Sequence, residues 1–272
     1  MSTNEKEAGE KVRKERGSAL EKSLAVLSAV IDQPQAVGLP DVAARVGLPR
    51  QTVHRVLQQL EENGLILRNP ARDRFSIGPK LTHFALKTLQ SANQGAPVRA
   101  VLQDLVNDIK ETCNIGVLDG LEFVYLERIE CEWSLRVHLR TGSRVPAHAA
   151  AAGKMMLSSL RPSSVMNLIK VQPLTAYTEY TITDASTFMG ELQQIREQSY
   201  SLTNQEYSVG LIGAAVPIVD RSRRQIAALA VQAPTSRLSL EEAIGHIPRL
   251  RAAANKLADV WVGEDAKSVL AA

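Results

Sequence analysis

Five side chains that can hydrogen-bond to the edges of DNA bases lie within six consecutive residues: Arg50, Gln51, Thr52, His54 and Arg55. An arginine fork can pair with guanine, and a glutamine amide can pair with adenine. Apolar residues recur through the same stretch at helical spacing, namely Val53, Val56, Leu57 and Leu60. The pattern predicts a helix that buries one face and presents the other to the major groove.

A second short helix is predicted just before it, over residues 39–46. Its apolar residues are Val42, Ala43 and Val46. Gly47 follows and can adopt the left-handed backbone of a tight turn, so the two helices are predicted to form a helix-turn-helix. The alternative is an ordinary helical hairpin with a solvated polar face. It is disfavoured because no acidic residue lies between Arg45 and Leu60, whereas plain surface helices usually mix charges.

A β-hairpin is predicted next. Residues 65–68 and 72–77 are β-capable, and the turn-like Asn69-Pro70-Ala71 separates them. Three arginines cluster on this hairpin: Arg68, Arg72 and Arg74. In a winged helix-turn-helix such a hairpin lies along the DNA backbone, so we expect these arginines to contact phosphate. The alternative is an exposed hairpin whose edge arginines only block aggregation.

The N-terminal region is predicted to hold an arm and a first helix. Residues 1–17 have little apolar content, so we expect a mobile arm that is either solvated or reaches DNA. Ser18 and Glu21 form a capping box, which indicates a helix start. The apolar face assigned to this helix is Leu20, Leu24, Leu27 and Ile31. The DNA-binding domain is therefore expected to span residues 18–78.

Pro79 opens another predicted helix, expected to link two domains over residues 79–94. Its apolar stripe consists of Leu81, Phe84, Ala85 and Leu89. Because this stripe is broader than one neighbour needs, we expect it to carry part of a dimer contact. Packing within its own protomer is the alternative.

Residues 95–263 alternate predicted helices and strands, and residues 264–272 form a predicted tail. Helices are expected over residues 98–111, 148–160, 185–199 and 239–260, and extended segments over 114–118, 122–128, 135–139, 211–219 and 225–231. Asp119-Gly120 is the strongest hairpin signal in the chain. The pattern predicts an α+β domain with helices packed on a mostly antiparallel sheet.

The charge of the chain is unevenly distributed. The 272 residues carry a net charge of +3. Residues 1–90 hold 14 Lys and Arg against 10 Asp and Glu, whereas residues 91–272 hold 18 against 19. The positive excess therefore accompanies the predicted helix-turn-helix, as a phosphate-binding surface requires.

The cysteines and the N-terminus indicate a reducing compartment. Cys113 and Cys131 show no metal-ligand spacing and are expected to be buried or free thiols. No apolar run reaches the length of a membrane span, and the charged N-terminus does not look like a signal peptide. We therefore expect a cytoplasmic protein with no membrane partner.

Enzymatic motifs do not emerge from the sequence. Gly153-Lys154 lacks the glycine spacing of a phosphate-binding loop, and no nucleophile elbow, zinc motif or dinucleotide fingerprint occurs. The five histidines are scattered, and the Met155-Met156 pair is expected to fill a core rather than bind a metal. We expect no catalytic residues, no metal site and no cofactor.

Taken together, the chain resembles the IclR family of bacterial transcriptional regulators over nearly its whole length. The similar stretches are Leu20–Leu27, LPDVAARVGLPRQTVHRVLQQLEENGLI, FSIGPKL, GSRVPAHAAAAGKMML, YTEYTITD, NQEYSVGLIGAAVPIVD and QIAALAVQAPTSRLS. The resemblance implies an N-terminal winged helix-turn-helix, a linker helix and a C-terminal effector-binding domain of GAF-like fold. It also implies dimers, often paired into tetramers, and small organic acids or aromatic catabolites as effectors.

The resemblance places the effector pocket against the sheet, near Ala151, Thr203, Gly213, Ala230 and Gln232. Small residues there would leave room for a ligand, or would only ease the packing of a helix on the sheet. Arg136 or Arg140 would supply a positive charge, unless each forms only a surface salt bridge. The family commonly has a glycine where this chain has Ser199 and an acidic pair where it has Thr203-Asn204, so the pocket chemistry is not carried over from one member.

The sequence thus predicts a ligand-responsive regulator that binds an inverted-repeat operator in double-stranded DNA as a homodimer or a dimer of dimers. Its effector is expected to be a small organic molecule, carboxylated or aromatic. The alternative is a metabolite-binding sensor or enzyme that uses the helix-turn-helix only for oligomerisation.

Overall fold

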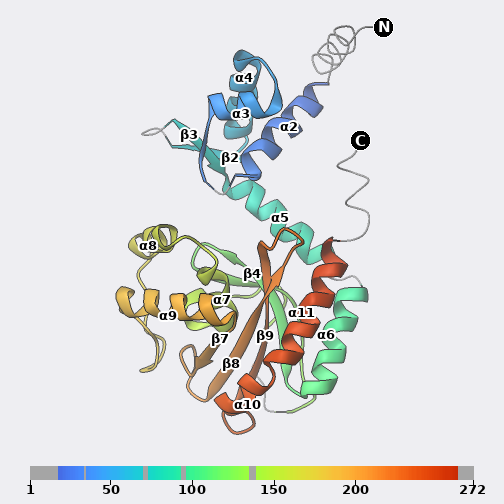
Figure 1. Cartoon of the computed structure of the whole chain (residues 1–272), viewed down its shortest axis with the longest axis vertical. Helices are drawn as coiled ribbons and strands as arrows, with labels where there is room; N and C mark the ends of the chain where they lie inside the picture. Colours follow the sequence, from blue (N-terminus) through green and yellow to red (C-terminus); the bar gives the residue numbers. More distant parts are fainter. Residues whose placement is uncertain (1–17, 34, 70–72, 93–95, 135–138, 263–272) are drawn as a thin grey trace. The chain divides into compact units, whose positions relative to one another are not determined.

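The computed structural model describes residues 18–33, 35–69, 73–92, 96–134 and 139–262. The chain divides into two compact units, residues 1–88 and residues 89–272 (Figure 1). Each unit has a hydrophobic core of its own.

The first unit is a winged helix-turn-helix. Its elements are α2 (Ala19–Ile31), β1 (Val37–Gly38), α3 (Leu39–Val46), α4 (Arg50–Glu62), β2 (Ile66–Asn69), β3 (Arg74–Ile77) and the first part of α5 (Pro79–Ala92). The three strands form an antiparallel sheet in the order β1-β3-β2. The predicted helix-turn-helix and the predicted hairpin are both confirmed.

Local sequence accounts for the bounds of these helices. The Ser18 hydroxyl accepts a hydrogen bond from the backbone N–H of Glu21 at 3.2 Å, and the Glu21 carboxylate accepts one from the Ser18 N–H at 2.7 Å. This capping box satisfies two N–H groups that would otherwise lack partners at the start of α2. Gly47 ends α3 with a φ of 65°, a left-handed conformation that suits glycine.

The face of α2 that packs on the core differs from the prediction. Leu20, Leu24 and Ile31 were expected to be inward but are 68%, 52% and 42% exposed. The buried residues are instead Val26, Ala29 and Val30. Both sets recur at helical spacing, and periodicity alone does not say which of two apolar stripes meets the core. The expectation was therefore wrong for these three residues, whereas the fourth predicted residue, Leu27, is half-buried and packs against the core. Helix α2 thus presents an apolar stripe to its surroundings.

The predicted stripe on α5 is likewise incompletely covered. Leu86 is buried, although it was not assigned to the stripe, and Phe84 is 49% exposed. Ala85 is exposed, Leu81 is half-buried, and the side chain of Leu89 lies outside the described residues.

The second unit is an α+β domain built on a six-stranded antiparallel sheet. Its elements are α6 (Ala96–Ile109), β4 (Thr112–Asp119), β5 (Glu122–Ile129), β6 (Arg144–Pro146), η1 (Ala147–Ala149), α7 (Ala151–Ser158), α8 (Pro162–Val171), α9 (Ala185–Gln198), β7 (Ser201–Asn204), β8 (Leu211–Val219), β9 (Gln225–Pro234), α10 (Leu240–Gly245) and α11 (Ile247–Val262). The strand order is β6-β5-β4-β9-β8-β7. The α+β prediction and the Asp119-Gly120 hairpin, with Gly120 at a φ of 63°, are confirmed. Helix α8 and strand β7 were not predicted, and residues 135–138 of the expected extended run lie outside the described residues.

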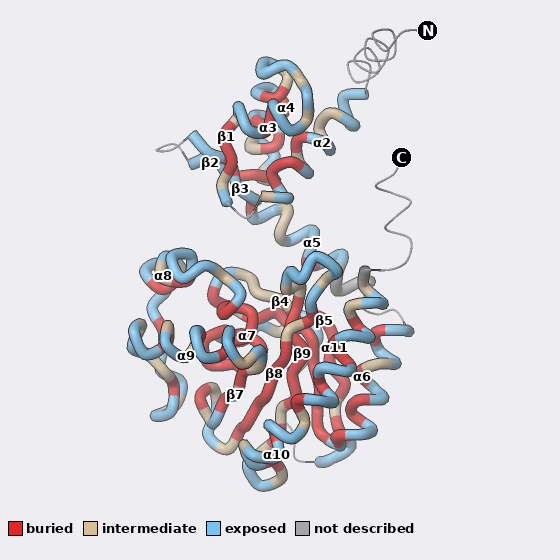
Figure 2. The backbone as a smooth tube through the Cα atoms, in the orientation of Figure 1, coloured by how far each residue is buried: buried red, intermediate tan, exposed pale blue. Residues whose placement is uncertain are grey.

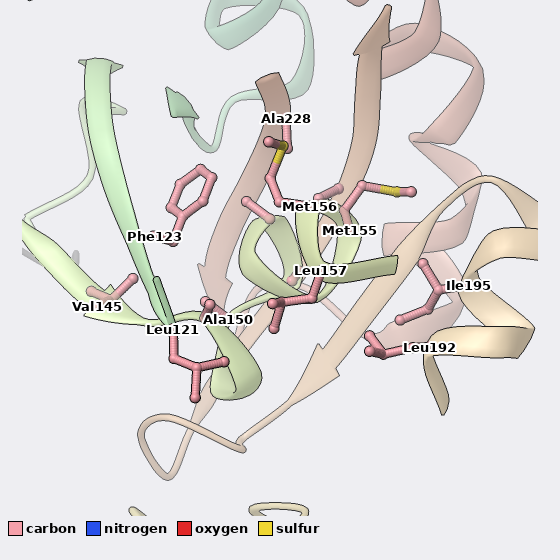
Figure 3. Packing of buried hydrophobic residues seen from close by; sticks show 14 of the residues in the cluster. Leu121, Phe123, Val145, Ala150, Met155, Met156, Leu157, Leu192, Ile195 and Ala228 are labelled. Carbon is pink, nitrogen blue, oxygen red and sulfur yellow. The ribbon is translucent and has the colours of Figure 1, made fainter. Parts of the chain in front are cut away.

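Helices cover both faces of this sheet (Figure 1). Helices α6 and α11 pack on one face, and α7 packs on the other with α9 outside it. Figure 2 shows that the central strands are buried along most of their length. In Figure 3, Met155, Met156 and Leu157 of α7 lie between the strands and Leu192 and Ile195 of α9. The two methionines therefore fill the core, as expected.

Candidate nucleic-acid interface and ligand site

Helix α4 separates its residues into a buried and an exposed side. Its buried residues are the four that were predicted: Val53, Val56, Leu57 and Leu60. On the outer side, Arg50, Gln51, His54 and Arg55 are exposed and Thr52 is half-buried. None of these five side chains forms a hydrogen bond or an ion pair with another residue that the structure describes. Their donors and acceptors are therefore available to a partner.

The arginines of the hairpin are more constrained. The Arg68 guanidinium lies 2.7 Å from the Asp73 carboxylate and over the ring of Phe75. Arg74 donates a hydrogen bond to the Ala36 carbonyl at 3.0 Å. Arg72 lies outside the described residues. Both described arginines keep N–H groups that a phosphate could accept from, because a guanidinium has five.

Four of the five residues assigned to the effector pocket come together at one end of the sheet. In the strand register, Gly213 of β8 lies opposite both Thr203 of β7 and Gln232 of β9. Ala151, the first residue of α7, lies against Gly213. Ala230 lies one step further along the same face and belongs to the hydrophobic core.

The glycines here allow close packing. A Cβ atom on Gly213 would lie 2.9 Å from the Thr203 hydroxyl oxygen and 3.4 Å from the Ala151 Cβ. A Cβ on Gly153 would overlap the carbonyl oxygen of Ala147. The space above these two glycines is therefore filled, and their small size lets α7 approach its neighbours. This geometry supports the alternative in which small residues ease packing.

A polar cluster joins Gln232 to three residues that the sequence analysis missed. It consists of Asn114, Tyr125, Arg128 and Gln232. The Gln232 amide oxygen accepts hydrogen bonds from Arg128 at 3.1 Å and from Asn114 at 3.5 Å, and its N–H group donates to the Tyr125 hydroxyl at 3.4 Å. Asn114 is 1% exposed and Tyr125 is 1% exposed. Burial raises the pKa of Tyr125 and lowers the pKa of Arg128, because both charged forms lose hydration.

A β-bulge brings two members of this cluster to the same side of β5. In β4, Ile115 pairs with Glu127 and the next residue, Gly116, pairs with Tyr125, so Leu126 is the extra residue. A bulge resets the alternation of side chains between the faces. Tyr125 and Arg128 therefore share one face, with the guanidinium 5.8 Å from the ring centre. Simple alternation along β5 would have separated them.

The structure does not show either of the two arginines expected to supply positive charge beside the predicted pocket residues. Arg140 is exposed and its backbone N–H donates to the Ser143 hydroxyl, and Arg136 lies outside the described residues. Arg128 is the arginine that the structure brings against Gln232.

Other features bear on the remaining expectations. Cys113 and Cys131 are both buried and free, and burial raises the pKa of Cys113. No group of three or more His, Cys, Asp or Glu side chains arranged to hold a metal occurs among the described residues. Within the same residues, no helix combines the length and the apolarity that a membrane crossing requires.

Comparison with known proteins accounts for both units. Residues 19–70 match the IclR helix-turn-helix domain, and residues 86–259 match the C-terminal domain of bacterial transcriptional regulators of the IclR type. The chain is 38% identical over 234 residues to the probable transcriptional regulator SauR of Cupriavidus necator, covering 86% of this chain and 92% of that protein.

Two solved structures are also similar. One is a putative transcriptional regulator from Rhodococcus, with a TM-score of 0.60 and 27% identity, covering 89% of this chain and 96% of the other. The second is a double mutant of the inducer-binding domain of the PobR transcription factor from Acinetobacter in complex with 3-hydroxybenzoic acid, with a TM-score of 0.57 and 33% identity, covering 61% of this chain and 99% of that domain. Together with the two domain matches, these similarities show that the chain belongs to the IclR family of bacterial transcriptional regulators.

Proposed function

We propose that this regulator binds an inverted-repeat operator as a dimer and that a small organic acid bound by its second unit modulates that binding. The outer side of α4 carries the proposal for DNA. Four of its five candidate base-reading residues are exposed, and none is engaged by another described residue. A helix of this kind placed in the major groove reads only a few base pairs, so useful specificity requires two half-sites.

The apolar stripe of α2 supports the proposal that the protein forms a dimer. Leu20, Leu24 and Ile31 recur on one side of the helix and remain exposed within the first unit. Exposed leucines that form a stripe on a small domain commonly mark a contact with another chain. A second copy of this protein is the partner that a two-fold operator requires.

This arrangement also separates our proposal from its competitor, in which the helix-turn-helix serves only oligomerisation. That competitor would place apolar residues on the outer side of α4, where the chain has Arg50, Gln51, His54 and Arg55. An exposed apolar stripe lies instead on α2, and further exposed apolar side chains lie on the hairpin and on α5, namely Leu67, Ile77 and Phe84. Oligomerisation through α2 leaves α4 available for DNA.

The polar cluster around Gln232 supports the proposal that the second unit binds an effector. It joins a guanidinium, two amides and a phenol on the face of the sheet where the effector residues were predicted. The relative solved with 3-hydroxybenzoic acid is an inducer-binding domain, which makes one-ring aromatic acids the first compounds to try.

DNA fragments selected from random sequence, followed by footprinting, test the proposal directly. We expect two protected half-sites related by a two-fold axis and about one helical turn apart or a multiple of it. A protected region with a single asymmetric half-site would contradict the dimer. A panel of organic acids added to the complex should include at least one that changes operator affinity.

A further inference from the structure

We infer that the Arg128 guanidinium, held in place by Gln232, is the group that binds the carboxylate of the effector. This inference rests on the proposed function, because it assigns the acid-recognising residue within that effector site. It replaces the two arginines that the sequence suggested with one that the sheet brings to the predicted residues.

The position of Arg128 connects it to the predicted pocket through the strand register. Arg128 lies opposite Asn114 on β4, and Gln232 of β9 accepts hydrogen bonds from both. Gln232 in turn lies opposite Gly213, which lies opposite Thr203. One face of the sheet therefore carries Arg128 on β5, Gln232 on β9 and Thr203 on β7, with β4 and β8 lying between these strands. The partial exposure of Gln232 gives this cluster access to solvent.

The cluster offers mainly hydrogen-bond donors. The guanidinium is a planar fork that matches the two oxygens of a carboxylate, and the Tyr125 hydroxyl, which accepts a hydrogen bond from Gln232, can donate as well. The Arg128 side chain is only 2% exposed. A hydrogen bond between charged groups is stronger in such a buried setting than at the surface. An anion gains more here than a neutral molecule of the same shape.

Asn114 adds a preference of a different kind. Its Oδ1 atom is buried and has no hydrogen-bond partner among the described residues. A buried amide oxygen without a donor is unfavourable. A ligand hydroxyl could supply that donor, whereas a carboxylate could not. The cluster therefore favours an acid that also carries a hydroxyl group.

The carboxylate of Glu130 lies near Arg128, so a bound acid would compete with it for the positive charge of the guanidinium. Its Oε1 atom lies 3.9 Å from the Arg128 Nε atom, beyond hydrogen-bonding distance, and its side chain is 25% exposed. Its charge attracts the guanidinium and would repel an incoming carboxylate. Removing this charge should therefore tighten the binding of acids.

Calorimetry on the full-length protein with 3-hydroxybenzoate, benzoate and benzamide tests the assignment. Wild type should bind 3-hydroxybenzoate more tightly than benzoate and benzoate more tightly than benzamide. Arg128→Gln should weaken binding of both acids by about tenfold or more, because hydrogen bonds to charged groups are lost. Its affinity for benzamide should stay near the wild-type value, so the preference for acids should disappear.

Matched variants keep the result interpretable. Glu130→Gln should strengthen the binding of both acids and leave the affinity for benzamide unchanged, because it removes a negative charge near the guanidinium. Arg99→Gln is the control, since Arg99 pairs with Glu127, the neighbour of Arg128 on the opposite face of β5. Arg128→Lys should retain the preference for acids but bind them with reduced affinity. This variant replaces Arg128→Gln in the test if the glutamine variant does not fold.

The two possible failures are distinguishable. If Arg128→Gln binds acids as tightly as wild type does, the Arg128 assignment is wrong and the effector class stands. The wild type could bind none of these aromatic acids while another acid from the panel alters operator affinity. In that case Arg128→Gln must weaken the binding of that other acid, and unchanged binding would overturn the assignment. If no acid binds at all, both the effector class and the assignment are overturned.

Discussion

The Lys154 ammonium of α7 lies 2.8 Å from the carboxylate of Glu206, in the loop after β7, and the lysine side chain is 1% exposed. A second carboxylate, that of Glu191 on α9, lies 2.9 Å from the same nitrogen. The backbone carbonyl of Glu206 also accepts a hydrogen bond from the Thr181 hydroxyl. Lys154 and its two carboxylate partners therefore hold α7, α9 and the loop after β7 together.

Replacing Lys154 by methionine should destabilise the second unit strongly. Removing one partner of a buried pair leaves the other charge uncompensated, at a typical cost of about 3–5 kcal/mol in the free energy of unfolding. Urea denaturation of the full chain measures this change. The double replacement Lys154→Met and Glu206→Gln should recover part of the loss, and equal losses in the single and double variants would count against a coupled pair.

The pH dependence of stability should report on Glu206. Burial raises the pKa of its carboxyl group above 4.5, and Lys154 only partly opposes this. The folded protein then binds the proton more tightly than the unfolded chain does. This carboxyl group therefore adds most to the free energy of unfolding below pH 4.5, and its contribution falls as the pH rises through the raised pKa. Subtracting the stability curve of Glu206→Gln from that of wild type should give a difference that decreases over this range. A difference that increases with pH would mean that the carboxyl is stabilised in its charged form.

Replacing Leu20 and Leu24 together by serine should weaken self-association with little effect on folding. Both side chains are exposed within the first unit, and surface substitutions usually change stability by no more than about 0.5 kcal/mol. Sedimentation velocity over a concentration series, together with operator titrations, measures the effect. Ala25→Glu, at an exposed position beside the stripe on the same helix, is the control. Wild-type association by the leucine variant would place the dimer contact elsewhere.

Much of the DNA-binding unit could be predicted because its determinants are local. The stripes on α4 and the left-handed turn at Gly47 follow from residues close in the sequence. The buried face of α2 could not be predicted, because two apolar stripes share one helix and only tertiary packing selects between them.

The ligand site was predicted less completely, because it depends on contacts between distant residues. The family resemblance implied Thr203, Gly213 and Gln232, which the sheet does bring together. Arg128 escaped notice because the bulge at Leu126 breaks the alternation that would place its side chain. The ion pair between Lys154 and Glu206 joins residues 52 positions apart, which no local pattern reveals.

The central claim is that the outer side of α4 reads a DNA sequence, and a competition experiment with the Arg55→Ala variant tests it most directly. Operator binding is measured against random-sequence DNA of the same length, over a range of salt concentrations. Arg55→Ala should reduce the preference for operator by about tenfold, since one good base contact contributes about 1–3 kcal/mol of discrimination. Arg72→Ala should weaken binding to both DNAs alike and mainly flatten the salt dependence. If Arg55→Ala retains the wild-type preference for operator, α4 does not read the sequence in the way proposed.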